Sequence, residues 1–291
     1  MRLALRRGVL LLVIGGALSA CTAPAVSLPL SEPAAAVVDG HTISMKAYQA
    51  RLEVSRHRDP FSGIKEAIPS PTPAQRLESF TIEQLVREEI VRQEAEKRRV
   101  GISDHAVQSR IDALKAKAGP TSFNAALNRN GFTSDSFRAY QRALLTEVAL
   151  LQTMAKDRAG SAAKELNAGD AFATVAARWS DDGGTSARGG DAGWLRPAEI
   201  PEPALATAVQ SLAAGGVTGI IPTNRGYVIA TVLERRSDQL HLATILVLAP
   251  AVDLFSPQGT PPWFTKFIDD RAATLRQAGR IELKVGNRGN G

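Results

Sequence analysis

The side chains best suited to do chemistry are concentrated in one glycine-rich stretch, WSDDGGTSARGGDAGW, at residues 179–194. Three carboxylates, Asp181, Asp182 and Asp191, lie among its glycines. Glycine-rich loops can cradle phosphate, but they do so between a strand and a helix, with a lysine following. No strand is expected to lead into this stretch and no lysine follows it, so we reject a phosphate site. A flexible surface loop is the interpretation that composition alone supports.

The other reactive residue types are too few or too scattered for a metal or cofactor site. The chain has one cysteine, which excludes an intrachain disulfide framework and a multi-cysteine zinc site. Its four histidines stand at residues 41, 57, 105 and 241, so none forms an HExxH-type pair. The P-loop of nucleotide-binding enzymes is also missing from the sequence. We therefore expect no metal and no cofactor.

Composition is that of a globular protein without a polyanion partner. The 291 residues give room for two modest domains, and 44% of them are hydrophobic and 22% charged. Aromatic residues make up 5%, too few for the stacking platforms of a single-strand nucleic-acid binder. The net charge of +6 includes three arginines within the first seven residues, so the rest of the chain has 32 basic and 29 acidic residues and is nearly neutral. We therefore expect no nucleic-acid partner.

The N-terminus has the pattern of an export signal that ends at the only cysteine. Three arginines precede an apolar run over 8–17, which is too short for a typical membrane span. The sequence Leu-Ser-Ala-Cys at 18–21 resembles the bacterial lipobox, which implies that Cys21 is lipidated and becomes the new N-terminus. An ordinary signal peptide with an incidental cysteine is the alternative. The proline-containing residues 22–36 are expected to form a tether to the membrane.

The first half of the chain is predicted to be mainly helical. Asp39-Gly40 between short runs of β-formers predicts a hairpin over 37–43. Apolar residues at helical spacing, together with capping residues and glycine stops, predict the helices that follow. They are expected over about 45–57, 74–99, 103–118, 121–129 and 134–156, with four prolines marking a loop over 58–73.

Residues 36–156 resemble the N-terminal chaperone domain of the SurA/PrsA family of exported foldases. The family pattern Val-Asn/Asp-Gly-x-x-Ile corresponds to Val38–Ile43. The family's turn between two helices corresponds to Gln93–Ala95 and Gly101–Asp104, with one extra residue. The resemblance implies a helical domain that binds unfolded polypeptide.

Residues 179–233 resemble the parvulin type of prolyl isomerase more specifically. The stretch 179–194 is similar to the parvulin active-site loop, 203–212 to the helix over the pocket, and 223–229 to the final strand Thr-x-x-Gly-Tyr-His-Ile. A short helix is predicted over 160–177, interrupted at 167–170. The first parvulin strand, which carries a histidine, has no counterpart before that helix.

A similar strand stands instead at 240–248, directly after the last parvulin strand. In the family these two strands are antiparallel neighbours, so a hairpin of 227–234 with 240–248 would supply the missing strand from the other end. This predicts a circularly permuted parvulin sheet. The alternative is the degenerate start of a second parvulin repeat.

The resemblance also implies the residues of a prolyl-isomerase site. Asp182 stands at the acid position, although it could equally be only a turn-former, and Thr223 keeps the family identity. Thr244 and Val228 stand where the family has histidines. The positions of the proline cup are Ile200 and Ala204, or Leu205 with a one-residue shift. His241 is expected to be a partly exposed strand residue, too far along the strand to replace a lost histidine.

Together these features predict an α+β protein: a helical chaperone domain completed by the C-terminal segment, plus a parvulin-like four-stranded antiparallel sheet with helices. The sheet is either circularly permuted or followed by the degenerate start of a second repeat. The C-terminal helix over 263–277 is followed by a strand over 280–285 that should pair with the 36–43 hairpin. The expected parts are a signal peptide (1–20), a tether (21–36), the chaperone domain (37–158), the parvulin-like domain (160–249) and the returning C-terminal segment (262–286).

The predicted function is that of an extracytoplasmic folding factor held at a membrane by lipid on Cys21. Its expected partners are unfolded or proline-containing exported polypeptides. Three possibilities remain open. The protein could isomerise prolyl bonds, it could be a chaperone or holdase with a degenerate parvulin domain, or it could be a scaffold subunit of an envelope complex. The absence of both pocket histidines favours binding of unfolded polypeptide without catalysis.

Overall fold

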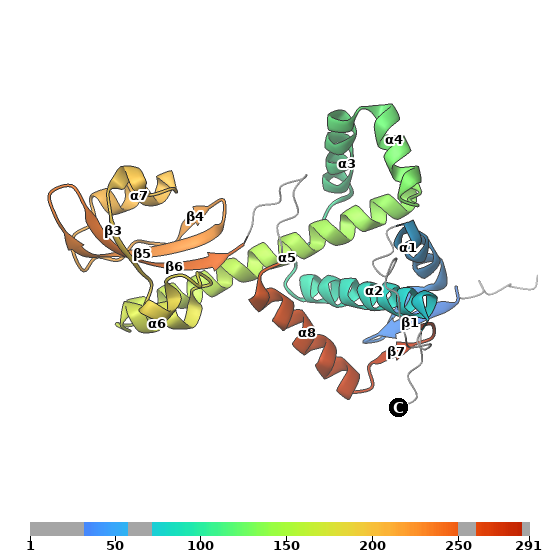
Figure 1. Ribbon diagram of the computed structural model, residues 1–291. Helices are drawn as coiled ribbons and strands as arrows, with labels where there is room; N and C mark the ends of the chain where they lie inside the picture. Colours follow the sequence, from blue (N-terminus) through green and yellow to red (C-terminus); the bar gives the residue numbers. More distant parts are fainter. Residues whose placement is uncertain (1–31, 58–71, 250–259, 287–291) are drawn as a thin grey trace, which may run out of the picture. The chain divides into compact units, whose positions relative to one another are not determined.

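The computed structural model describes residues 32–57, 72–249 and 260–286, and Figure 1 shows the arrangement of their helices and strands. The expected signal peptide, Cys21, most of the tether and most of the two proline-rich loops lie outside the described residues. The longer helices are α1 Met45–His57, α2 Pro73–Lys97, α3 Asp104–Ala118, α4 Pro120–Arg129, α5 Ser134–Asn167 and α8 Pro262–Gln277. Two shorter helices are α6 Phe172–Trp179 and α7 Pro203–Gln210. The strands are β1 Ala34–Val38, β2 His41–Ser44, β3 Asp191–Leu195, β4 Ile221–Thr223, β5 Gly226–Arg235, β6 Leu240–Leu248 and β7 Ile281–Leu283.

Local capping explains where the helices of the first half begin. The Thr72 hydroxyl accepts a hydrogen bond from the Gln75 N–H at 3.2 Å, and the Gln75 side chain accepts one from the Thr72 N–H at 2.8 Å. Ser103 accepts from the Ala106 N–H at 3.1 Å in the same way before α3. Such bonds satisfy N–H groups that have no partner within the helix. The predicted positions of α1 to α4 are confirmed to within a few residues.

Helix α5 is longer than predicted and corrects two expectations. The sequence predicts one helix ending near 156 and another over 160–177, but a single helix runs to Asn167 and α6 follows separately. Ala155, Ala159 and Ala162 are buried along one side of α5, so packing continues through the expected break. That burial outweighs the roughly 1 kcal/mol by which a glycine such as Gly160 disfavours a helix interior. The expected domain boundary at 158–160 therefore falls inside one helix.

A three-stranded antiparallel sheet with the order β2-β1-β7 joins the two ends of the described chain. The hairpin turn has positive φ at both central residues, 53° at Asp39 and 83° at Gly40, as a two-residue turn of this type requires. Strand β7 pairs with β1 in the register Val38 with Ile281. The predicted return of the C-terminal strand is confirmed. One correction concerns the tether, because residues 34–36 belong to β1 and Ala35 and Ala36 are fully buried.

A four-stranded antiparallel sheet with the order β3-β6-β5-β4 lies in the second half of the chain. Strands β5 and β6 form a hairpin in which Val228 pairs with Leu246 and Ala230 with Thr244. Strand β6 also pairs with β3 on its other side, so it occupies an inner position. The pairing that a circularly permuted parvulin sheet requires is therefore present. The strand β3 over Asp191–Leu195 was not predicted, because most of it lies in the stretch 179–194 that was expected to be a loop.

The two faces of this sheet are covered by different helices. Figure 1 shows α7 on one side of the sheet and α6 on the other. Alternation along the strands explains this, since successive side chains point to opposite faces. Val228 and Leu246 pack with α7 residues such as Val209, whereas Ile229 and Ile245 pack with Val175 of α6.

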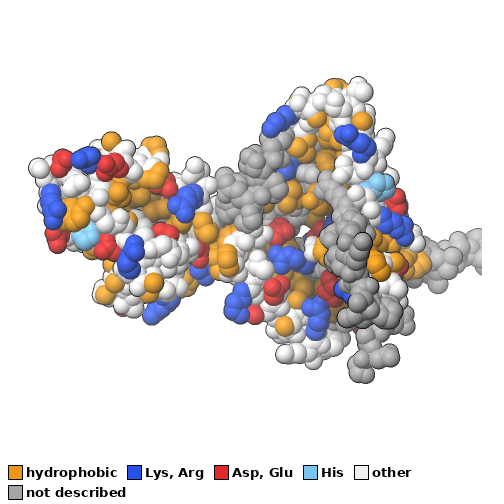
Figure 2. All heavy atoms as spheres, viewed as in Figure 1, with side chains coloured by type: hydrophobic (Ala, Val, Ile, Leu, Met, Phe, Trp, Pro, Cys, Tyr) orange, Lys and Arg blue, Asp and Glu red, His pale blue; other side chains and the backbone are white. Residues whose placement is uncertain are grey.

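Charged side chains of both signs are interspersed over the face shown in Figure 2, in keeping with the small net charge of +6.

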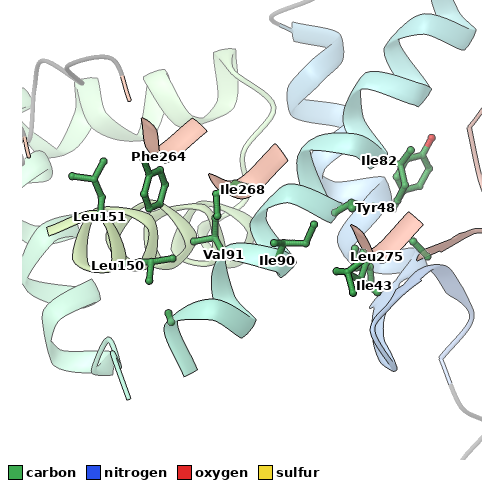
Figure 3. Packing of buried hydrophobic residues seen from close by; sticks show 14 of the residues in the cluster. Ile43, Tyr48, Ile82, Ile90, Val91, Leu150, Leu151, Phe264, Ile268 and Leu275 are labelled. Carbon is green, nitrogen blue, oxygen red and sulfur yellow. The ribbon is translucent and has the colours of Figure 1, made fainter. Parts of the chain in front are cut away.

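The main core lies between α2, α5, α8 and the three-stranded sheet. Figure 3 shows Phe264, Ile268 and Leu275 of α8 along this core, together with Val91 of α2 and Leu151 of α5. The C-terminal helix therefore packs into the core of the helical region.

Candidate functional site

Two predicted cup residues, Ile200 and Leu205, are brought together with Val228, which stands at a family histidine position. Ile200, Leu205 and Val228 belong to one buried apolar cluster that also contains Leu246 of β6. Leu205 is 5% exposed and contributes to the cluster, whereas the neighbouring Ala204 is exposed. Of the two alternatives for the aromatic position of the family, the structure therefore places Leu205 on the apolar face and Ala204 outside it.

Thr244 faces the same side of the sheet as this cluster. It lies between Leu242 and Leu246 on β6, and both of these leucines belong to the cluster. Side chains two residues apart on a strand share a face, so the Thr244 hydroxyl is directed to the α7 side. Its backbone N–H donates to the carbonyl of Gly190 at 2.8 Å, which attaches the glycine-rich loop to β6.

The polar candidates Thr223 and Asp182 are each engaged in their own turns. The Thr223 hydroxyl donates to the Gly226 carbonyl at 3.1 Å and accepts from the Arg225 N–H at 3.2 Å. The Asp182 carboxylate accepts from the Thr185 hydroxyl at 2.8 Å and from the Gly184 N–H at 3.1 Å. Asp182 was considered as an acid of the isomerase site or as a turn-former. Its contacts are those of a turn-former.

The preceding residue, Asp181, has more long-range contacts than Asp182, although nothing in the sequence distinguishes the two aspartates. The Asp181 carboxylate accepts from the Leu248 N–H at 2.9 Å, and its own N–H donates to the Leu246 carbonyl at 2.7 Å. It also lies 3.5 Å from the Arg158 guanidinium of α5. Arg158 in turn lies over two indole rings, 5.3 Å from the centroid of Trp179 and 4.8 Å from that of Trp263. Asp181 therefore links the glycine-rich loop to β6 and α5.

Burial raises the pKa of Asp181 above its ordinary value, and the Leu248 N–H and the Arg158 charge offset this only in part. The opposite holds for Glu94 in α2. Burial acts to raise its pKa as well, but hydrogen bonds from Lys97 and Arg98, both at 2.7 Å, outweigh the burial and lower it. The two acids therefore contribute to the pH dependence of stability with opposite signs.

We expect Asp181→Asn to change the pH dependence of unfolding. An unfolded aspartate releases its proton near pH 3.9, whereas folded Asp181 keeps it to higher pH. The stabilisation from Asp181 is therefore full below about pH 4 and is lost as pH rises through the raised folded pKa. The free energy of unfolding of the wild type, minus that of Asp181→Asn, should fall from pH 4 to pH 7. Urea unfolding followed by tryptophan fluorescence measures this difference.

Glu94→Gln is the comparison for that experiment. Its folded pKa is lowered, so its contribution is present above about pH 4.3 and is lost as pH falls through the folded pKa. The free energy of unfolding of the wild type, minus that of Glu94→Gln, should therefore rise with pH. Parallel pH curves for the wild type and Asp181→Asn would contradict the assignment.

His241 lies on the side of β6 opposite to Thr244, since the two residues are an odd number of positions apart. Its Nε2 lies 2.8 Å from Asp191 Oδ1, and its ring stacks on Trp194 with the centroids 5.0 Å apart. The same Asp191 oxygen accepts from the Gly193 N–H at 2.8 Å. His241 is half-buried and belongs to the β3–β6 pairing, so it does not replace a pocket histidine.

Within the described ranges, no three His, Cys, Asp or Glu side chains are grouped as they would be around a metal ion. No helix in those ranges is both long enough and apolar enough to cross a membrane.

Comparison with protein families assigns most of the chain to two known domain types. Residues 145–234 match the PPIC-type peptidyl-prolyl isomerase domain, called rotamase. Residues 9–151 match the SurA-like N-terminal domain. The first range contains the parvulin-like stretch 179–233, and the second covers most of the chaperone-like stretch 36–156.

The curated relatives are SurA chaperones. That of Chromobacterium violaceum is 24% identical over 300 aligned positions, which cover 84% of this chain and 68% of the relative. That of Alkalilimnicola ehrlichii is 34% identical over 82 positions, 28% of this chain and 19% of the relative. The second match thus spans only a small part of its relative.

Two solved structures are similar at low identity. The peptidylprolyl isomerase PrsA of Bacillus anthracis has 17% identity and a TM-score of 0.26, over 71% of this chain and 99% of that chain. A SurA-like chaperone of Campylobacter jejuni has 11% identity and a TM-score of 0.28, over 87% and 99%. Because both TM-scores are below 0.5, our assignment depends on the two domain matches and the SurA relatives. On these findings the chain belongs to the family of SurA-like chaperones with a PPIC-type peptidyl-prolyl isomerase domain.

Proposed function

We propose that this protein binds unfolded exported polypeptides as a chaperone, and that its parvulin-like domain contributes binding surface with little or no prolyl isomerisation. Residues 37–158, with the β1 residues 34–36 and the returning segment 262–286, would form the chaperone domain, and 160–249 the parvulin-like domain, with helix α5 running through both. The observation that carries the proposal is the engagement of both polar candidates, Asp182 and Thr223, in turns of their own loops.

The chemistry of prolyl isomerisation explains why the engagement of Asp182 and Thr223 in their own turns matters. Rotation about the amide bond must overcome a barrier of about 18–20 kcal/mol. A catalyst lowers it only by binding the twisted amide more tightly than the planar one. In this protein the face beneath α7 is aliphatic at Ile200, Leu205 and Val228, and Thr244 is its half-buried hydroxyl. Such a face favours apolar side chains but offers few groups that distinguish a twisted amide from a planar one.

A second candidate function is prolyl isomerisation itself. The buried cluster supports it, because the cup positions Ile200 and Leu205 lie together with Val228, at a family histidine position, on one face of the sheet. Thr244 would then orient the substrate, and Asp182 would have to leave its contacts with Thr185 and Gly184 to reach the amide. The first function is preferred since it needs no such rearrangement.

A protease-coupled assay on a proline-containing tetrapeptide separates the two functions. We expect no isomerisation above the spontaneous rate, while stoichiometric protein suppresses aggregation of a chemically denatured client. Asp182→Ala should leave both results unchanged, as should Asp170→Ala, a control at an exposed carboxylate. Clear isomerisation by the wild type that is lost in Asp182→Ala, but kept in Asp170→Ala, would establish the second function instead.

We also propose that lipid on Cys21 holds the protein at a membrane. The proposal is supported by the Leu-Ser-Ala-Cys sequence that ends the apolar leader, and by the absence of any other cysteine from the chain. Expressed in a bacterium, the wild type should sediment with membranes and be extracted by detergent. Cys21→Ser should abolish lipid labelling and move the protein out of the membrane fraction. Cys21→Ser protein that stays in membranes, or a wild type that takes up no lipid label, would contradict the anchor.

A further inference from the structure

Helix α7 is short and contributes only two buried side chains, Leu205 and Val209, to the apolar cluster. Three of its eight residues are alanines, each with a single methyl group to bury. At its start, the Glu202 carboxylate lies 4.0 Å from the Arg225 guanidinium, a long separation for an ion pair. The placement of α7 against the sheet therefore depends strongly on what holds its C-terminal end.

Arg235 of β5 holds that end by three hydrogen bonds. Its Nε donates to the Leu212 carbonyl at 2.8 Å, and its Nη2 donates to the carbonyls of Val209 at 2.8 Å and Gln210 at 2.7 Å. Carbonyls in the last turn of a helix lack partners within the helix, and the helix dipole attracts a cation there. A guanidinium suits this place because its donors form a rigid fork, whereas an ammonium has a single nitrogen.

A β-bulge directs Arg235 to the α7 side of the sheet. The strand residue Val232 faces α7, so regular alternation would turn Arg235, three positions later, to the opposite face. The register with β6 shifts after Val232, because one extra residue, Leu233, stands in β5. Arg235 consequently pairs with Leu240, whose side chain is buried on the α7 side. Bulges beside binding sites commonly redirect a side chain in this way.

We propose that Arg235 is a positioning residue: by holding α7 in place, it sets how tightly the apolar face of the parvulin-like sheet binds a proline-containing segment. The inference rests on the proposed binding function and names a residue outside the apolar face that controls it. Leu205 on α7 and Val228 on β5 stand on opposite walls of the cluster, so a displacement of α7 changes the distance between the walls. Walls that are held before binding lower the cost of ordering them.

Hydrogen exchange of the full chain without ligand tests the first step. Arg235→Met removes the donors but keeps a long side chain, and the position is exposed, so the variant should fold. Its α7 amides should exchange at least tenfold faster than those of the wild type, because hydrogen bonds from a charged donor are lost. Exchange of α7 at the wild-type rate in Arg235→Met would overturn the inference.

Arg236→Met is the matched control. It removes the same charge from the next residue, whose guanidinium lies over the Trp194 ring, 3.8 Å from the centroid. Exchange of α7 should stay within twofold of the wild type. Should Arg235→Met lose the circular dichroism of the wild type, Arg235→Gln replaces it with the same expected results. Equally fast exchange in the Arg235 and Arg236 variants would mean that loss of charge, not the bonds to α7, is responsible, and would overturn the inference.

Two labelled peptides of identical composition test the effect on binding. One has Phe-Pro at its centre, and the other has the phenylalanine and the proline at opposite ends. Fluorescence anisotropy with the full wild-type chain should give a Kd at least fivefold lower for the Phe-Pro peptide, since adjacent apolar side chains can occupy one face together. Arg235→Met should lose this preference and Arg236→Met should keep it. Arg235→Lys, which restores one donor nitrogen, should show an intermediate preference.

The chaperone assay separates this inference from the proposed function. A preference that Arg235→Met retains would overturn the inference, as would a wild type that binds the two peptides equally. If aggregation of a denatured client is still suppressed in either case, only the role of Arg235 is wrong and the proposed chaperone function stands. If the wild type fails to suppress aggregation as well, the proposed function itself is refuted.

Discussion

Gly226→Ala is expected to lower the free energy of unfolding by about 4 kcal/mol, from roughly 1–3 kcal/mol of backbone strain and a similar cost of overpacking. Gly226 has a φ of 140°, which side chains rarely tolerate, and a Cβ would stand 2.1 Å from the Val247 carbonyl oxygen and 2.5 Å from the Ala249 nitrogen. These are backbone atoms of β6 and its end, so they cannot turn aside as a flexible side chain could. The substitution should therefore loosen the pairing of β5 with β6.

Gly215→Ala is the control for Gly226→Ala. Gly215 also has a positive φ, 79°, but a Cβ there would meet nothing within 4 Å. Its cost should be limited to backbone strain of about 1–2 kcal/mol. Urea unfolding of both variants measures the difference, and hydrogen exchange of the β6 amides shows where it arises. Equal losses in the two variants would mean that close packing against β6 is not what Gly226 provides.

Phe264→Ala is expected to cost about 3–5 kcal/mol, the usual range for removing a buried phenyl ring. Phe264 is 0% exposed and lies in the core shared by α2, α5 and α8. The cavity left behind would weaken attachment of the whole C-terminal segment, including β7 and its pairing with β1. We expect the Tm to fall by roughly 6–20 °C, taking about 2–4 °C per kcal/mol for a chain of this size. Differential scanning calorimetry measures the change.

Lys266→Ala is the control on the same helix. Its side chain is exposed and pairs with Asp270 one turn later at 2.9 Å, and such surface pairs contribute about 0.5 kcal/mol or less. Limited proteolysis should cleave the C-terminal segment of Phe264→Ala faster than that of Lys266→Ala. Equal cleavage rates and an equal Tm would contradict the packing of α8 into the core.

Local signals were sufficient to predict many of the elements. The Asp39-Gly40 turn, the Thr72 and Ser103 caps and the helical spacing of apolar residues are determined within a few residues of chain. The resemblance of 240–248 to a parvulin strand added a long-range prediction, and its pairing with 226–235 is confirmed. The local pattern of residue types could not predict this pairing, because strand pairing depends on contacts between distant segments.

The predictions that failed depended on such contacts. The end of α5 was misplaced because burial of Ala159 and Ala162 by other elements is not visible in their own spacing. The tether was drawn through residues 34–36 because the core that buries Ala35 and Ala36 comes from distant segments, and β7, which pairs with β1, lies almost 250 positions later. Local composition describes a segment alone, whereas these residues are ordered by what packs on them.

In the candidate site, too, some features follow from the sequence and others depend on contacts between distant segments. The order of residues along the chain placed Ile200, Leu205, Val228 and Thr244 in a parvulin-like pattern, and the strand register then brought their side chains to one face. No local signal distinguishes Asp181 from Asp182, yet one binds β6 and Arg158 while the other closes its own turn. Arg235 likewise reaches the end of α7 only because a bulge shifts the register of β5. Which helices and turns form is decided mainly by neighbours in the chain, whereas which side chains are buried, charged or presented together is decided by tertiary packing.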